Sequence, residues 1–291
     1  MLNGDLAEEA RKGLEDAVKT HADVVERATE VSVELYKLRK KASHKVIPLV
    51  EEYVNSLANS PKEFDKTFKE FHIQVAAFDK AVQQVEEALT DAAVKGGAGA
   101  GAGIAAGAAT AFAAPTAAMA IATTFGTASS GAAISTLSGA AATNAALAWL
   151  GGGALAAGGG GMAGGSALLA LAGPVGLGLA AVCAAGGAIY VRSKNTAIAE
   201  EANSRRQEVE ARRAATEAAC VEVGEILKLT KTQVNGIRKL LAQVVDGAPS
   251  SYNLYDDERK LKLAAVINHV RTLGQLLNRR LAVGEVAQLA R

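Results

Sequence analysis

The side chains that most often carry out chemistry stand far apart in this sequence. A histidine with an ordinary pKa titrates near pH 6.5 and can serve as a metal ligand, a general base or a pH sensor. The four histidines have no spacing typical of a metal site; they are His21, His44, His72 and His269. Several acidic residues form adjacent pairs, which diverge by about 100° around a helix and suit solvent exposure better than a shared proton. We expect the histidines on helix surfaces or interfaces, and no catalytic residues and no metal site.

One glycine-rich stretch, residues 159–164, matches the letters of a dinucleotide-binding motif. Such a site needs a preceding strand and an acidic residue about 20 positions further on, whereas the next acidic residue here is Glu200. The sequence has no Walker-type phosphate loop, and Cys183 and Cys220 lack the spacing of metal ligands. A net charge of +1 gives no general reason to expect nucleic-acid binding. The sequence therefore predicts a protein without enzymatic activity, cofactors or a nucleic-acid partner.

The dominant feature of the chain is its middle, where residues 96–191 contain no Asp, Glu, Lys, Arg or His. We call these 96 residues the uncharged block; they are rich in Ala and Gly. Residues 1–95 carry a net charge of −4 and residues 192–291 a net charge of +5. We therefore predict an N-terminal arm (1–95), a membrane-insertion segment (96–191) and a C-terminal arm (192–291). The arms have opposite net charge and should attract each other, unless both are simply solvated surfaces, because exposed ion pairs are weak.

Apolar residues in the N-terminal arm follow the three- and four-residue steps of amphipathic helices. The first helix has Ala28, Val31, Leu35, Leu38, Ala42, Val46, Leu49, Tyr53 and Leu57 on one stripe. Pro48, with His44 before it, should bend this helix, because proline removes a backbone hydrogen bond. A second helix begins after Ser60 and carries an unbroken heptad row: Phe64, Phe68, Phe71, Val75, Phe78, Val82, Val85, Leu89 and Ala92. Such a row requires a partner helix, which is either another arm of the same chain or a second copy.

The C-terminal arm repeats this organisation. A third helix is predicted from Arg192 to about Asp246, with Ala219, Val223, Ile226, Thr230, Val234, Ile237, Leu241 and Val244 on one face. After a loop, a fourth helix presents Leu263, Val266, Val270, Leu273, Leu277 and Leu281. No segment of the arms alternates with the two-residue period of a strand. The predicted fold is all-α: long amphipathic helices form a coiled-coil-like bundle, with a central uncharged, Ala/Gly-rich hydrophobic helical hairpin.

Two stretches of the uncharged block are long enough to cross a bilayer core of about 30 Å, which needs about 20 helical residues. They are Ser166–Val191, which ends beside Arg192, and Ile104–Phe125; a weaker stretch runs from Ile134 to Leu155. Glycines four residues apart, such as Gly99, Gly103 and Gly107, let helix backbones touch and favour association. The residues predicted to insert or to pack helices are Gly99, Gly103, Gly107, Phe112, Pro115, Phe125, Trp149, Gly161, Gly165, Leu169, Pro174 and Tyr190.

Basic residues flank the block on both sides, at Lys95 and Arg192. The positive-inside tendency places both flanks on one side of a membrane, which favours an even number of passes and most simply a hairpin. An Ala/Gly-rich stretch can also form a tightly packed hairpin inside a soluble bundle, or a spacer. Both states are compatible if the segment is hidden first and inserted later.

The layout of long amphipathic helices before and after one uncharged block resembles that of the α-helical pore-forming proteins of the cytolysin A and haemolysin BL type. The resemblance is one of architecture and covers the whole chain. It implies a hydrophobic element that is tucked away in a soluble form and released onto membranes. No residue-level motif is shared, so the resemblance assigns no role to any single residue.

Three functions are compatible with this sequence. The first is a toxin-like protein that inserts the hairpin into a lipid bilayer and oligomerises into a pore or lesion, with or without a second protein component. The second is a membrane-anchored coiled-coil scaffold without pore activity, and the third is a soluble interaction module. The N-terminal stretch has no basic region followed by an apolar one, so no Sec signal peptide is expected. We expect synthesis in the cytoplasm, followed by a membrane-associated state or a soluble state that awaits a trigger.

Overall fold

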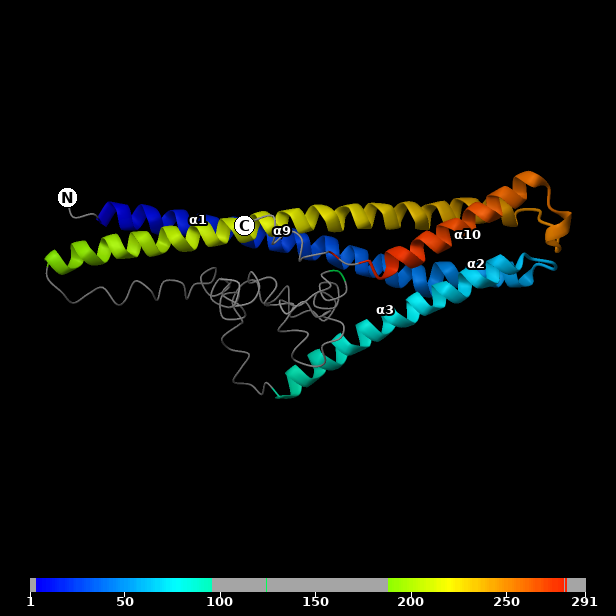
Figure 1. Ribbon diagram of the computed structural model, residues 1–291, viewed down its shortest axis with the longest axis horizontal. Coiled ribbons are helices and arrows are strands. Elements are labelled where there is room, and N and C mark those ends of the chain that lie inside the picture. The colour runs from blue at the N-terminus through cyan, green and yellow to red at the C-terminus, as the bar shows by residue number, and fades with distance from the viewer. Residues whose placement is uncertain (1–3, 96–123, 125–187, 280, 282–291) are drawn as a thin grey trace.

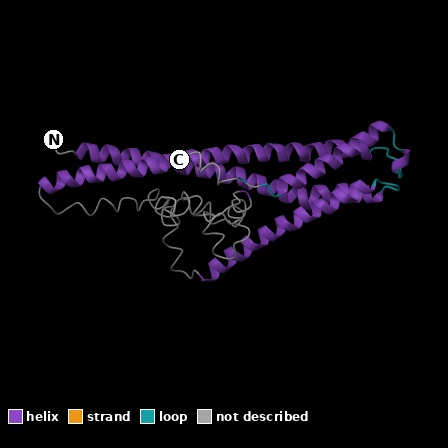
Figure 2. Cartoon of the chain, viewed as in Figure 1, coloured by secondary structure: helices purple, strands orange, loops and turns teal. Residues whose placement is uncertain are grey.

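The computed structural model describes residues 4–95, 124, 188–279 and 281, with the side chains of 84–95, 188–194 and 212 left out. Every long element in these ranges is a helix and none is a strand (Figure 2), so the all-α prediction is confirmed for this part of the chain. The elements are α1 (Gly4–Lys41), the π-helix η1 (Ala42–Val46), α2 (Ile47–Ser56), α3 (Lys62–Lys95), α9 (Ala188–Val245), the 3₁₀-helix η5 (Tyr252–Leu254) and α10 (Asp257–Leu277).

The two longest helices, α1 and α9, lie side by side and run in the same direction along the molecule (Figure 1). Residue pairs fix this parallel register. Gly13 lies against Arg206, and Glu34 forms an ion pair with Lys231 at 2.6 Å, so residue numbers rise together along both helices. A parallel pair cannot be joined by a short turn, because the chain has to return the full length of the helix. The return passes through α3 and the uncharged block.

The helices α3 and α10 run in the opposite direction and are parallel to each other (Figure 1). Arg271 Nη2 donates to Thr67 Oγ1 at 3.3 Å, and Asn278 Nδ2 donates to the Gln74 carbonyl at 2.8 Å. The main core is where they meet α2 and the end of α9. It consists of Ala42, Val46, Ile47, Val50, Val54, Leu57, Phe64, Phe68, Phe71, Val234, Ile237, Val244, Tyr255, Leu263, Val266, Ile267, Val270 and Leu273. Half of the molecule is thus a four-helix bundle, and the other half is mainly the α1–α9 pair.

The loops 57–61 and 246–256 close one end of the bundle, which we call the loop end. Ala58 N–H donates to the Ser250 carbonyl and Tyr252 N–H donates to the Ala58 carbonyl, each at 2.9 Å. The hydroxyls of Tyr53 and Tyr255 share a hydrogen bond of 2.5 Å. Burial, together with that bond, raises the pKa of Tyr255 well above its usual value. These bonds join a loop of the N-terminal arm to a loop of the C-terminal arm.

The predicted bend at His44 and Pro48 corresponds to one π-turn between α1 and α2. Ile47 N–H donates to the Ala42 carbonyl, five residues back instead of four, and the next residue, Pro48, has no N–H to give. The wider turn changes the phase of the stripe, and the prediction for Leu49 is therefore wrong. Val50 and Val54 are buried after the turn, whereas the Leu49 side chain is 59% exposed.

A buried arginine joins α1 to the end of α10. The Arg39 side chain is 0% exposed, and its Nη2 donates to the carbonyls of Leu276 and Arg279, both at 2.7 Å. The last carbonyls of a helix have no partner within the helix, and a cation there also complements the helix dipole. Arg39 therefore takes the place of a C-terminal cap and holds the chain that leaves α10 against α1.

Replacement of Arg39 should destabilise the bundle strongly. In Arg39→Met the apolar part of the side chain is kept, but two buried carbonyls lose a charged donor, which costs about 3 kcal/mol of unfolding free energy. The measurement is a urea titration followed by circular dichroism. Lys40→Met, at the exposed neighbouring position, should change the unfolding free energy by less than about 0.5 kcal/mol. Equal unfolding midpoints for the two variants would contradict the capping role.

Two glycines of α9 should respond oppositely to the same substitution. A Cβ at Gly236 would lie 2.6 Å from His269 Nε2, and the ring is held by a 2.6 Å hydrogen bond between Nδ1 and Gln233 Oε1. Gly236→Ala should therefore lower the unfolding free energy by about 1–3 kcal/mol. A Cβ at Gly224 meets nothing within 4 Å, so Gly224→Ala should raise the unfolding free energy by about 0.5–1 kcal/mol. Thermal unfolding of both variants checks the pair; the same sign for both would refute the packing.

Candidate membrane-insertion site

Most of the residues predicted to enter the membrane lie outside the described part of the chain. They are Gly99, Gly103, Gly107, Phe112, Pro115, Phe125, Trp149, Gly161, Gly165, Leu169 and Pro174. Tyr190 belongs to the first turn of α9, although its side chain is not described. What the structure does describe is the frame to which the uncharged block is attached.

The block is attached to the frame at Lys95, where α3 ends, and at Ala188, where α9 begins. Both helix ends lie away from the loop end (Figure 1). The third helix was predicted to begin at Arg192, and the structure places its start four residues earlier, at Ala188. Residues 188–191 thus belong both to the uncharged block and to α9. The helix therefore does not begin at the first charged residue after the block. Ala, Ile, Tyr and Val can form helix without a charged neighbour.

Thr124, the described residue of the block that stands outside α9, lies against the frame. Its side chain is 0% exposed, and its carbonyl accepts a hydrogen bond from Leu281 N–H at 3.2 Å. Leu281 is itself buried in a small core with Leu35, Val223, Ile226 and Leu227. Arg39 holds the preceding residues 276–279 through their carbonyls, so the block contacts the frame where Arg39 ends α10.

Sequence reasoning missed both of these residues. The signal for Arg39 was its position: it stands four residues after Leu35 and three before Ala42, on the buried stripe of α1. A charge at such a position requires a buried partner. Thr124 carried no comparable signal, since hydroxyls are scattered through the block.

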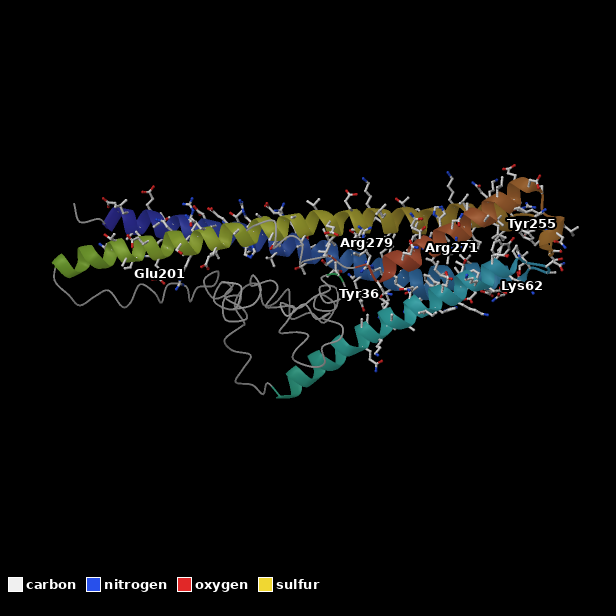
Figure 3. All side chains as sticks on the ribbon, viewed as in Figure 1. Tyr36, Lys62, Glu201, Tyr255, Arg271 and Arg279 are labelled. Atoms are coloured by element: carbon white, nitrogen blue, oxygen red, sulfur yellow. The ribbon has the colours of Figure 1, made fainter. Side chains whose placement is uncertain are left out.

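The heptad row of α3 packs inside its own chain over the described part of the helix. The side chains of Phe64, Phe68, Phe71, Phe78 and Val82 are buried, while those of Val85 and Leu89 are not described. The first three phenylalanines belong to the main core, and the ring centroid of Phe78 lies 6.0 Å from that of Tyr36 on α1. Figure 3 labels Tyr36 in the middle of the molecule, near Arg279. The described residues of the row therefore pack against α1, α2, α9 and α10 of the same chain.

Two imidazole–carboxylate pairs link α3 to the α1–α2 side. His44 Nε2 lies 3.0 Å from Asp79 Oδ1, and His72 Nε2 lies 2.9 Å from Glu51 Oε2. All four side chains keep contact with water, so each pair contributes little to stability. The third resolved histidine contact, between His269 and Gln233, joins α10 to α9. These histidines therefore lie at helix interfaces.

Two further properties of the frame concern metals and membranes. The described residues include no group of three or more His, Cys, Asp or Glu side chains arranged to hold a metal ion. Among the described helices, none combines the length and the apolar character needed to span a bilayer.

Comparison of the chain with protein-family models, with curated proteins and with solved structures finds no match.

Proposed function

We propose that this protein is membrane-active: it inserts the uncharged block into a lipid bilayer as a helical hairpin and oligomerises into a pore or lesion. The observation that carries the proposal is the run of 96 residues without one ionisable side chain. Two segments of this run have the length of a bilayer crossing, and basic residues stand at both of its ends.

The composition of the main core supports a separate role for the block. All of the described residues of this core come from the two arms, from Ala42–Phe71 on one side and Val234–Leu273 on the other. Within the described part of the chain, the arms thus bury each other's apolar stripes. In this proposal the uncharged segment between them serves for contact with lipid.

The attachment points of the block are compatible with a hairpin in this proposal. Lys95 and Ala188 stand at helix ends that both lie away from the loop end (Figure 1). Since α9 already includes residues 188–191, a spanning helix over Ser166–Val191 would continue α9 in the same direction. The bundle would then stand on the membrane side where both basic flanks remain.

Small residues supply the oligomer contacts in this proposal. Gly99, Gly103 and Gly107 would form one row along a helix, and Gly161 and Gly165 a second. Rows of this type allow backbones to approach closely inside lipid, where no hydrophobic force drives helices together. A hairpin of Ala and Gly inserts weakly by itself, so association would stabilise the inserted state.

Release of a dye from liposomes tests the pore. The unaltered protein should cause leakage, and the double variant Gly103→Leu/Gly107→Leu should leak about ten-fold less, because two large side chains separate the helices. The control is Gly131→Leu/Gly139→Leu, which adds the same apolar bulk within the block but outside both glycine rows. The control should leak as the unaltered protein does.

The absence of leakage at every pH and lipid composition tried would overturn the pore. If alkaline carbonate fails to extract such a protein from membranes, the function is permanent anchoring by a scaffold instead. A conditional inserter is found in the soluble fraction before it meets the target membrane. Equal losses in the two glycine variants would show that bulk, and not the glycine row, limits activity.

Replacement of residues 96–187 by a Gly/Ser linker of equal length tests whether the block is a soluble core. Because the described residues of the main core all come from the arms, the variant should remain helical and unfold within about 5 °C of the unaltered protein. It should release no dye. A collapse of the thermal transition would show that the block completes the interior of the bundle, and would remove the main support for membrane insertion.

A further inference from the structure

Acidic residues are missing from two stretches of the described chain that lie at the same level of the bundle. None occurs among residues 35–50 of α1, η1 and α2, or among residues 226–245 of α9. The ion pair between Glu34 and Lys231 shows that these stretches begin side by side. Each of them contains four exposed or partly exposed basic side chains besides the buried Arg39. Positive charge is therefore concentrated on these stretches of α1, η1 and α9, while α3 brings Asp79 to the same level, beside His44.

Three lysines form a line along α1 and η1, which we call the lysine stripe: Lys37, Lys41 and Lys45. They are four residues apart, the spacing of one helix face, and all three are exposed. No ion pair joins any of them to a carboxylate in the described part of the chain. Leu49 follows four residues after Lys45, beyond the π-turn, and its side chain is 59% exposed. This section of the chain thus carries unpaired positive charge and, close by in the sequence, an exposed apolar side chain.

The adjacent face of α9 extends the stripe across the helix interface. In a parallel helix pair, equivalent positions repeat every seven residues, so the positions that follow the Glu34–Lys231 ion pair are those of Lys41 and Arg238. Both of these side chains are exposed and positively charged. Like charges at neighbouring positions destabilise a helix pair, and an anionic partner would remove that penalty.

We propose that the lysine stripe, together with Arg238 and Leu49, is the surface by which this protein binds an anionic phospholipid bilayer before insertion. The inference rests on the proposed function and adds the lipid class and the docking face. Clusters of four or more basic residues on a helix are attracted to the negative surface potential of anionic membranes. Leu49 favours a bilayer over nucleic acid, because an exposed aliphatic side chain gains by entering the interface but has no partner among phosphates.

Sedimentation with vesicles tests the surface. Vesicles with about a third phosphatidylserine in phosphatidylcholine should bind the protein, and pure phosphatidylcholine vesicles should bind it far less. The variant Lys37→Gln/Lys41→Gln/Lys45→Gln should bind the anionic vesicles about 100-fold more weakly, at roughly five-fold per lysine. Binding should also be lost at about 1 M NaCl, where the Debye length falls to about 3 Å.

The matched control is Lys19→Gln/Lys62→Gln/Lys69→Gln, which removes the same charge from three exposed lysines elsewhere. It should bind within about three-fold of the unaltered protein, and both variants should keep the helical circular dichroism spectrum. Equal weakening in both variants, or equal binding to neutral vesicles, would overturn the docking face. Tighter, stripe-dependent binding to a duplex DNA fragment would assign the surface to nucleic acid and overturn it as well.

Dye release from the same vesicles separates this inference from the proposed function. Stripe-dependent binding without leakage supports the docking face and rejects the pore. Leakage that is equal for both lysine variants at matched protein concentration supports the pore and rejects the docking face.

Discussion

The mutual burial of apolar stripes from two distant parts of the chain is the constraint on which the rest of the structure depends. Phe68 and Phe71 of α3 share one core with Ile237 and Val244 of α9, although more than 160 residues lie between them. Each helix is amphipathic and gains little stability in isolation. Because the arms bury each other, the charged faces of the described helices turn to water, and the uncharged block connects α3 to α9 in the sequence.

Periodicity predicted the elements well, and it failed where backbone or charge departed from regularity. The faces of α10 and of the distal half of α9 agree with their predicted stripes, since Leu263, Leu273 and Ile237 are buried. The prediction that Leu49 lies on the buried stripe was wrong because one π-turn rotates the following residues around the helix axis. Residue types alone do not reveal such a turn. The role of Arg39 was missed because its partners are the backbone carbonyls of Leu276 and Arg279, which are 237 and 240 residues away in the sequence. The parallel direction of α1 and α9 was also beyond the pattern, because an apolar stripe has no direction.

Hydrogen bonding in the interfaces explains why the bundle accommodates polar residues without cross-helix specificity. The buried hydroxyls of Thr29, Ser32 and Thr230 each donate to a carbonyl four residues back on their own helix, at 2.6–2.8 Å. These groups are therefore satisfied before the helices meet, and they neither fix the register nor oppose separation. Register is instead set at a few places with long-range bonds. They include the loop end, Arg39 on the end of α10, Asn278 on Gln74, Arg271 on Thr67, and the Glu34–Lys231 ion pair.

The packing of α9 against its neighbours weakens along the helix toward the end that joins the uncharged block. A heptad of buried residues runs through the helix: Ala202, Val209, Thr216, Val223, Thr230, Ile237 and Val244. In the distal half Ile226, Leu227 and Val234 are buried as well, whereas in the proximal half the six residues 203–208 are all exposed. Hydrophobic stabilisation scales with buried apolar area, so an Ala contributes far less than an Ile. Local unfolding is therefore least costly where α9 joins the block and most costly at the main core. A bundle built in this way can open where α9 joins the uncharged block while the four-helix half stays folded, which is the order of events that the proposed release onto a membrane would require.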